Sequence, residues 1–240
     1  MTDRMASIRT PWTAILAAQH GDAETRARCL AEIAEKYYGP VRAYIAALAH
    51  CNNPDIEDDL AQGFFHKFLE REILNRLNRD IGQFRQFLKT AVRNYVKDEI
   101  SRAGRNNPNS PLTRHHSLPA GEIALQGRQP LTPEDEFNRR WARDLVNDAV
   151  TAFRTDCFDH NKQHYFAVFE RHVLTAGEET NPDYAATAHS LGISEKDVAN
   201  YLHRARKRFR GVLLEMVRAT VRDEDDVEKE LAELRQYFQR

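Results

Sequence analysis

Apolar residues recur at steps of three and four along most of the chain, a spacing that predicts α-helices rather than strands. In the first part of the chain it predicts helices over 23–50, 55–72 and 83–103, with Asp55 suited to cap the second. The inward-facing positions carry many phenylalanine and tyrosine side chains. Three helices with this much aromatic surface predict a first small domain over residues 1–103.

Periodicity is weak between residues 104 and 133, where prolines, asparagines and serines gather. This composition predicts a flexible linker. Helical spacing resumes over 133–153, 161–174, 183–191 and 194–221, which predicts a second small domain over 134–222. The remaining residues, 223–240, are rich in acids and predict a charged amphipathic helix or a frayed tail.

Composition agrees with an all-α fold, because 10 glycines and 9 prolines in 240 residues leave room for long helices. Neither a signal peptide nor a membrane-spanning run of about 18 apolar residues is present. The three cysteines, Cys29, Cys51 and Cys157, are odd in number and far apart, as expected of reduced thiols. We therefore expect a cytoplasmic protein with two small helical domains joined by a flexible linker.

The net charge of −1 neither favours nor excludes binding to nucleic acid. The segment 184–198 is more informative. Gly192 can turn the chain sharply, Ile193 can fill the space between two helices, and Ser194 can cap the second helix together with Asp197. This pattern predicts a helix-turn-helix, whose second helix lies in the major groove of DNA. An ordinary helical hairpin is the alternative. The basic run that follows the turn favours DNA. The candidate contacts are Ser194, Lys196, Asn200, Tyr201, His203, Arg204, Arg206 and Lys207.

A second basic stripe lies on the predicted helix 83–103. Its cations recur at intervals of four, with aromatic residues between them and two further polar residues beside them. Such a surface suits single-stranded or melted DNA. An ordinary solvated face, with the aromatic residues in the core, is an equal alternative. The candidate contacts are Arg85, Lys89, Arg93, Asn94, Lys97 and Arg102.

Acidic residues gather at the start of the predicted helix 55–72. They favour the helix dipole, which is a sufficient explanation, but they also suit a docking surface for a basic partner. No histidine or catalytic motif accompanies them. Cys157, His160, His164 and the nearby His172 lack a convincing fourth zinc ligand. The sequence therefore predicts no enzyme, no metal and no cofactor.

In this order, the segments resemble an extracytoplasmic-function sigma factor of the sigma-70 superfamily. The resemblance is carried by DIEDDLAQGFFHKFLER, FRQFLKTAVRNYVKDEISR and YAATAHSLGISEKDVANYLHRARKRFR, and it covers about residues 23–105 and 134–215. It implies that the domains correspond to σ2 and σ4, joined by a tether that threads RNA polymerase. It also implies core polymerase as the partner, through the β′ clamp and the β subunit.

The resemblance assigns a role to each segment. The loop 78–83 and the stripe-bearing helix would melt the −10 element, and the helix from Ser194 would read the −35 element. An anti-sigma factor or another regulator is a further candidate partner. The acidic helix would dock on the β′ coiled coil through Asp55, Asp58, Asp59 and Gln62.

The chain departs from the family in two places. Ile56 stands at an acidic position of the family motif, and Ala199-Asn200-Tyr201 replaces the common lysine, serine and arginine. Asn200 can pair with an adenine edge instead. The acidic tail exceeds the minimal family, and we expect it to restrain DNA binding by competing for Arg204–Arg210.

Two other classes of protein stay open. A helix-turn-helix repressor or activator with an N-terminal sensory domain would not engage polymerase as a sigma subunit. A σ-like decoy or anti-σ partner would need the acidic helix but no working recognition helix. The acidic motif and the basic stripe favour the sigma factor, because neither has a role in a repressor.

Overall fold

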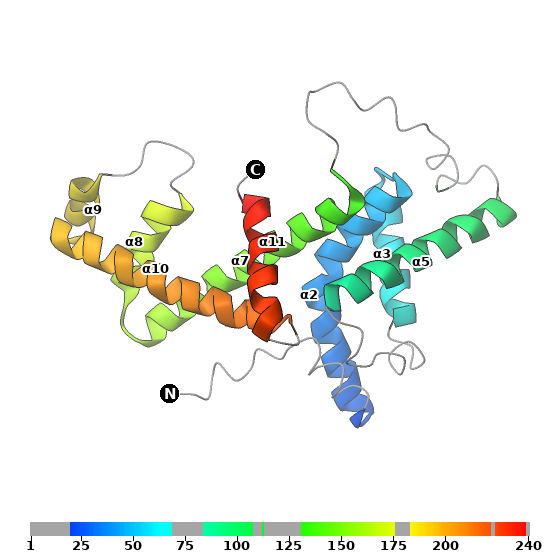
Figure 1. The fold of residues 1–240 in the computed structure, drawn as a ribbon, viewed down its shortest axis with the longest axis horizontal. Coiled ribbons are helices and arrows are strands. Elements are labelled where there is room, and N and C mark those ends of the chain that lie inside the picture. The colour runs from blue at the N-terminus through cyan, green and yellow to red at the C-terminus, as the bar shows by residue number, and fades with distance from the viewer. Residues whose placement is uncertain are drawn as a thin grey trace, which may run out of the picture. The chain divides into compact units, whose positions relative to one another are not determined.

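A computed structural model describes residues 20–68, 84–107, 112, 131–175, 183–221 and 224–238. These residues are almost entirely helical, and none of them lies in a β-strand (Figure 1). The predicted all-α class is therefore confirmed. Most of the predicted linker 104–133 and the predicted loop 78–83 lie outside the described residues. No helix in the described ranges is long and apolar enough to cross a membrane.

The chain divides into two compact units, residues 1–143 with 218–240, and residues 144–217. The division differs from the predicted boundaries at 133/134 and 222/223. The start of helix α7 (Pro133–Asp159) belongs to the first unit because Phe137 and Trp141 are buried there. Phe137 meets the ring of Tyr44 edge to face, with 5.7 Å between centroids. The C-terminal segment also belongs to the first unit.

The first unit is built on α2 (Ala23–Ala49), α3 (Pro54–Phe68) and α5 (Phe84–Asn106). Helix α11 (Glu224–Phe238) completes it. Of the two predictions for this segment, a helix or a frayed tail, the helix is confirmed. Aromatic rings fill the core, as the pattern predicts. Tyr37 meets Phe84 edge to face at 5.0 Å, and Phe64 stacks on Phe68 at 5.6 Å.

Helix ends in the first unit are fixed by side-chain caps. The Thr25 N–H donates to the Asp22 carboxylate at 2.8 Å and fixes the start of α2. Helix α3 begins at Pro54, one residue before the predicted cap Asp55. The Asn53 side chain accepts instead from the Asp55 N–H at 3.0 Å. The predicted cap was therefore wrong. Asn53, two residues before Asp55, is an equally suitable capping residue and takes this position.

The second unit holds the rest of α7 together with α8 (Gln163–Phe169), α9 (Tyr184–Leu191) and α10 (Glu195–Arg218). A π-helical turn, η3 (Glu170–Leu174), follows α8, so the predicted helix 161–174 is not regular throughout. The aromatic core joins three helices. Phe153 meets Phe169 at 5.1 Å, and Phe169 meets Phe209 at 4.8 Å. This core fixes α10 as a scaffold for its outer face.

Candidate nucleic-acid interface

The turn between α9 and α10 follows the predicted geometry. Asp183 caps α9 by accepting from the Ala185 N–H at 3.3 Å. Gly192 ends the helix with φ of 65° and ψ of 34°, the left-handed conformation that glycine adopts most readily. The Ile193 N–H then donates to the Ala188 carbonyl at 3.1 Å. The chain thereby reverses within three residues and enters the next helix.

Helix α10 starts with a reciprocal cap between Ser194 and Asp197. The Asp197 N–H donates to Ser194 Oγ at 3.1 Å, and the Ser194 hydroxyl donates to Asp197 Oδ2 at 2.6 Å. The Ser194 N–H also points to the same carboxylate at 3.4 Å. Aspartate thus fills the role that glutamate has more often in a capping box. The predicted cap is confirmed.

The two helices of the motif are held together by a small apolar cluster. Val168, Ala188, Val198 and Leu202 are buried in it, and Ile193 packs against it as predicted. A buried polar contact supports the same joint. The ring of His172 lies 3.0 Å from Thr187 Oγ1, and burial lowers the pKa of this histidine. The motif is therefore a fixed helix-turn-helix.

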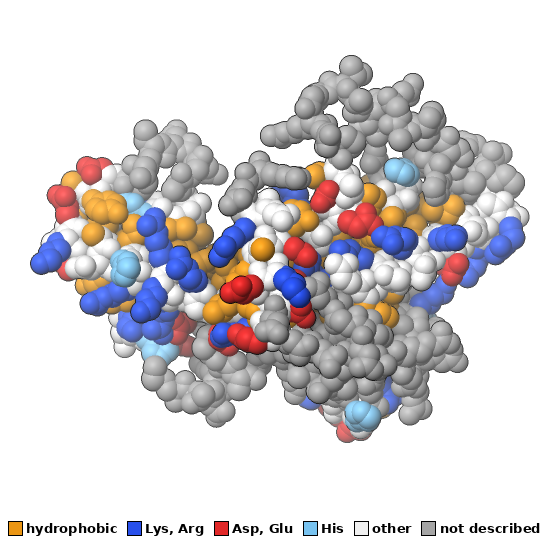
Figure 2. Space-filling model, in the orientation of Figure 1, with side chains coloured by type: hydrophobic (Ala, Val, Ile, Leu, Met, Phe, Trp, Pro, Cys, Tyr) orange, Lys and Arg blue, Asp and Glu red, His pale blue; other side chains and the backbone are white. Residues whose placement is uncertain are grey.

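The outer face of α10 is exposed and cationic. Its residues recur at helical spacing opposite the buried Val198, Leu202 and Ala205. From the first to the last it extends about 21 Å, at 1.5 Å per residue. Figure 2 shows Lys and Arg side chains gathered over this part of the surface. The exposed face consists of Lys196, Ala199, Asn200, His203, Arg206, Lys207 and Arg210.

Two cations of the basic run have protein partners. Arg208 binds the Asp156 carboxylate through two nitrogens, one of them at 2.6 Å, and Arg204 donates to Tyr165 Oη at 3.1 Å. Tyr201 is half-buried and packs on the Tyr165 ring at 4.9 Å. Among the described residues, Arg206 and Lys207 form no ion pair, so their charges are available to phosphates.

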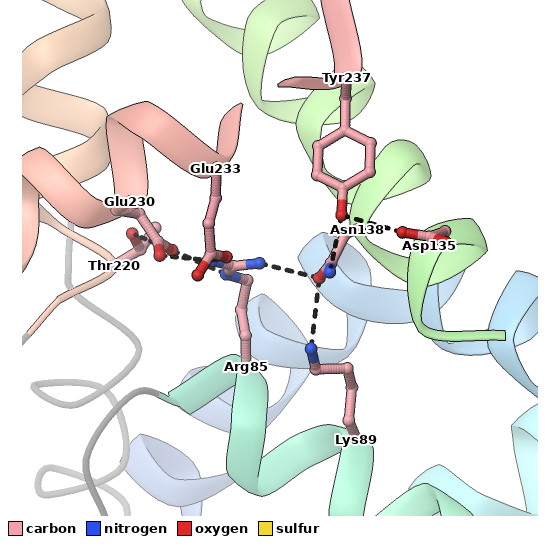
Figure 3. Close-up of polar contacts among 8 residues, drawn as sticks. All are labelled: Arg85, Lys89, Asp135, Asn138, Thr220, Glu230, Glu233 and Tyr237. Atoms are coloured by element: carbon pink, nitrogen blue, oxygen red, sulfur yellow. Dashed lines mark hydrogen bonds and ion pairs between the residues drawn. The ribbon is translucent and has the colours of Figure 1, made fainter. Parts of the chain in front are cut away.

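The first half of the second stripe, Arg85-Lys89-Arg93-Lys97 on α5 (hereafter the α5 stripe), is covered. Only 1% of Arg85 and 6% of Lys89 is exposed, so the prediction that both face DNA does not fit this conformation. Arg85 Nε donates to Glu230 at 2.7 Å (Figure 3). The guanidinium also lies 4.0 Å from the ring centroid of Trp141. The cover comes from α11 and the start of α7.

The other stripe residues lie further along α5. Arg93 pairs with Glu134 and donates to Tyr44 Oη at 3.1 Å. Asn94 and Lys97 are exposed. Arg102 is also exposed but pairs with its neighbour Glu99 at 2.6 Å. The structure thus brings the predicted set onto one helix but leaves only its second half open to solvent.

At the acidic start of α3, one of the predicted residues forms an ion pair with α2 and three face solvent. Asp58 pairs with Arg42 at 2.6 Å and accepts from the Tyr38 hydroxyl at 3.2 Å. Asp55, Asp59 and Gln62 are exposed. Three of the four residues predicted to bind polymerase are therefore accessible, whereas Asp58 also ties α3 to α2.

No group of three His, Cys, Asp or Glu side chains in the described ranges is arranged to hold a metal ion. Cys157 is buried, which raises its pKa to about 11. Its thiol is therefore protonated near neutral pH and is a poor nucleophile. The sequence-based interpretation missed the pairing of α11 with Arg85. The signal for a docked helix was present, because Val227, Leu231 and Leu234 recur at helical spacing.

Comparison of the chain with protein-family models, curated proteins and solved structures finds no match. The helix-turn-helix and the charged surfaces are therefore the basis on which function is inferred.

Proposed function

We propose that the protein is a sigma-type transcription initiation factor, which binds core RNA polymerase and directs it to promoters. The observation that carries this proposal is the exposed cationic face of α10, set on a capped helix-turn-helix. Helices of this kind enter the major groove with their first turns and contact base edges there. Cations further along the helix then bind the phosphates on either side.

Individual residues of α10 take different roles in this proposal. Lys196 and Asn200 lie in the first two turns, where base edges are read, and an asparagine amide can bond an adenine in two places. Arg206, Lys207 and Arg210 follow on the same face and would bind phosphates. Arg208 contributes to the fold instead, because Asp156 holds it.

The acidic surface of α3 supports the polymerase part of the proposal. Asp55 and Asp59 are exposed carboxylates on a helix that is fixed to α2 through Asp58 and Arg42. A rigid, solvent-facing acidic patch suits a basic coiled coil such as that of the β′ clamp. Asn94 and Lys97, on the open half of the α5 stripe, would meet the melted −10 strand.

A helix-turn-helix repressor or activator is the second candidate. The burial of Arg85 and Lys89 favours it, because it removes two cations from the surface that would bind melted DNA. A σ-like decoy is less well supported, since α10 keeps the face that such a protein would not need.

Charge reversal on α3 separates the sigma factor from the repressor. We expect Asp55→Lys with Asp59→Lys to abolish capture of core polymerase, because like charges across an interface cost several kcal/mol. The matched control is Glu32→Lys with Glu35→Lys, which makes the same charge change at exposed sites on α2. It should bind polymerase as the wild type does. Circular dichroism would verify that both variants keep their helices.

The same proteins would be tested for transcription from a pool of genomic fragments, with the 5′ ends of the RNAs mapped. A sigma factor produces transcripts that depend on it and share upstream sequences. A wild-type protein that binds duplex DNA but neither captures polymerase nor starts transcription would overturn the proposal in favour of the repressor.

A further inference from the structure

The first unit contains a buried cationic surface that the C-terminal helix of the same chain occupies. The side chains of Arg85 and Glu230 are each only 1% exposed, although 145 residues separate them. Figure 3 shows α11 presenting two carboxylates, from Glu230 and Glu233, to this one guanidinium. A charge buried so fully must have partners, and α11 supplies two carboxylates.

The contact has the geometry with which arginine binds phosphate. Glu230 receives two nitrogens of Arg85, Nε at 2.7 Å and Nη2, while Glu233 lies 2.9 Å from Nη2. Two parallel N–H donors on two oxygens form the fork that suits carboxylate and phosphate alike. The carboxylates of α11 therefore stand where phosphate oxygens would bind.

A second group of contacts ties α11 to α7 beside the fork. The Asn138 amide donates to Tyr237 Oη at 3.1 Å, and its oxygen accepts from Arg85 at 2.9 Å. Lys89 Nζ reaches the same oxygen at 3.5 Å. Asn138 thus links both buried cations to the docked helix (Figure 3).

The covering groups follow the register of the α5 stripe. Arg85 meets Glu230, Lys89 meets Asn138, and Arg93 meets Glu134 of α7. Only Lys97, at the far end, is exposed without an ion pair among the described residues. Anionic and polar oxygens therefore run along the stripe as the backbone of a nucleic-acid strand would.

Releasing α11 costs less free energy than the attraction between Arg85 and its two carboxylates alone would suggest. Burying an ion pair removes water from both charges, and this cost offsets much of the attraction between them. If α11 leaves, both partners regain water, and Arg85 joins the open cations of the stripe. Any polyanion that replaces the carboxylates would recover the same fork.

We propose that α11 and single-stranded DNA compete for the α5 stripe, so that the docked helix masks a nucleic-acid surface of the first unit. The identity of the ligand rests on the proposed function. The masking itself depends on the contacts of Arg85 with α11 and on Asn138, which joins Lys89 to Tyr237.

The test uses the full chain with Glu230→Gln and Glu233→Gln. Glutamine keeps the shape but leaves the Arg85 charge unneutralised, which opposes docking. The matched control is Glu224→Gln with Glu228→Gln, which makes the same charge change at exposed sites of α11. The first readout is amide hydrogen exchange over residues 224–238. The second is affinity for a fluorescent oligothymidine of about twenty nucleotides at fixed salt.

We expect the Glu230/Glu233 variant to exchange faster over α11 and to bind the oligonucleotide roughly tenfold more tightly, since the competent state becomes more populated. The Glu224/Glu228 control should do neither. In the wild type, saturating oligonucleotide should raise exchange over α11, because competition is reciprocal. Adding Arg85→Gln to the Glu230/Glu233 variant should remove the gain in affinity.

An α11 that stays protected while the oligonucleotide is bound would overturn the proposal, and so would an equal gain in the control. If the glutamine pair leaves α11 docked, Glu230→Lys places like charge against Arg85. Continued protection in that variant also overturns it. Duplex binding through α10 and polymerase capture, measured on the same variants, report separately on the proposed function.

Discussion

The carboxylate of Asp156 accepts two hydrogen bonds from the guanidinium of Arg208 and so joins α7 to α10 within the second unit. This pair takes one cation out of the basic run and uses it to fix the helix that bears the others. The hydrogen bonds from Arg208, reinforced by its charge, also lower the pKa of Asp156.

We expect Asp156→Ala to destabilise the protein by about 1–3 kcal/mol, because it removes charge-assisted hydrogen bonds from a partly buried arginine. Urea unfolding of Asp156→Ala, Arg208→Ala and the double variant would isolate the coupling between the two side chains. Additive effects of the two single substitutions would show that the pair contributes nothing of its own.

Two glycines give a matched test of the turn. Gly192→Ala should destabilise by about 1–2 kcal/mol, because a side chain is strained at its φ of 65°, although no atom lies within 4 Å of the added carbon. Gly211 lies within α10 with equally open space, so Gly211→Ala should stabilise by about 0.5–1 kcal/mol. Thermal unfolding measures both. Effects of the same sign would contradict the left-handed turn.

The buried His172 predicts a pH dependence of stability. Burial lowers its pKa below the ordinary value of 6.5, so the unfolded chain takes up this proton more readily than the folded one. The associated stability is fully present above about pH 6.5 and is lost as the pH falls through the lower, folded-state pKa. His172→Gln cannot titrate. Its stability should fall less than that of the wild type between about pH 7.5 and pH 5.5 in urea unfolding, and equal losses would refute the assignment.

Residues on the outer face of α10 should fall into two groups, those that contact bases and those that contact phosphates. Asn200→Ala should lose preference for particular sequences at a cost of about 1–3 kcal/mol on the best site, because it removes a base contact. Lys207→Ala should weaken binding to all duplexes alike and reduce the salt slope by about one unit. Selection from a random duplex library, followed by salt titration, measures both. An Asn200→Ala variant that changes only the salt slope would show that this residue contacts a phosphate.

The turn of the helix-turn-helix was predictable because its determinants are local. Gly192, Ser194 and Asp197 act within six residues, and each has a conformational preference that no distant part of the chain needs to supply. The α5 stripe was not predictable in the same way. Cations at four-residue spacing are usually solvated, and only a partner 145 residues away buries Arg85.

The acidic tail makes contacts that its position along the chain did not indicate, for the same reason. We expected residues 223–240 to compete for Arg204–Arg210, which are close in sequence. The carboxylates of Glu230 and Glu233 instead bind Arg85 within the first unit. Proximity along the chain was a poor guide because the apolar side of α11, with Val227 and Leu234 buried, decides where the helix packs.

The place of α11 in the first unit also sets an order of events during synthesis. Residues 144–217 form one uninterrupted stretch, so the second unit can fold as soon as it leaves the ribosome. The first unit begins to emerge earlier, yet Arg85 receives its carboxylates only after residue 233 has been made. The buried polar contacts of the first unit are therefore completed after the whole of the second unit has been made.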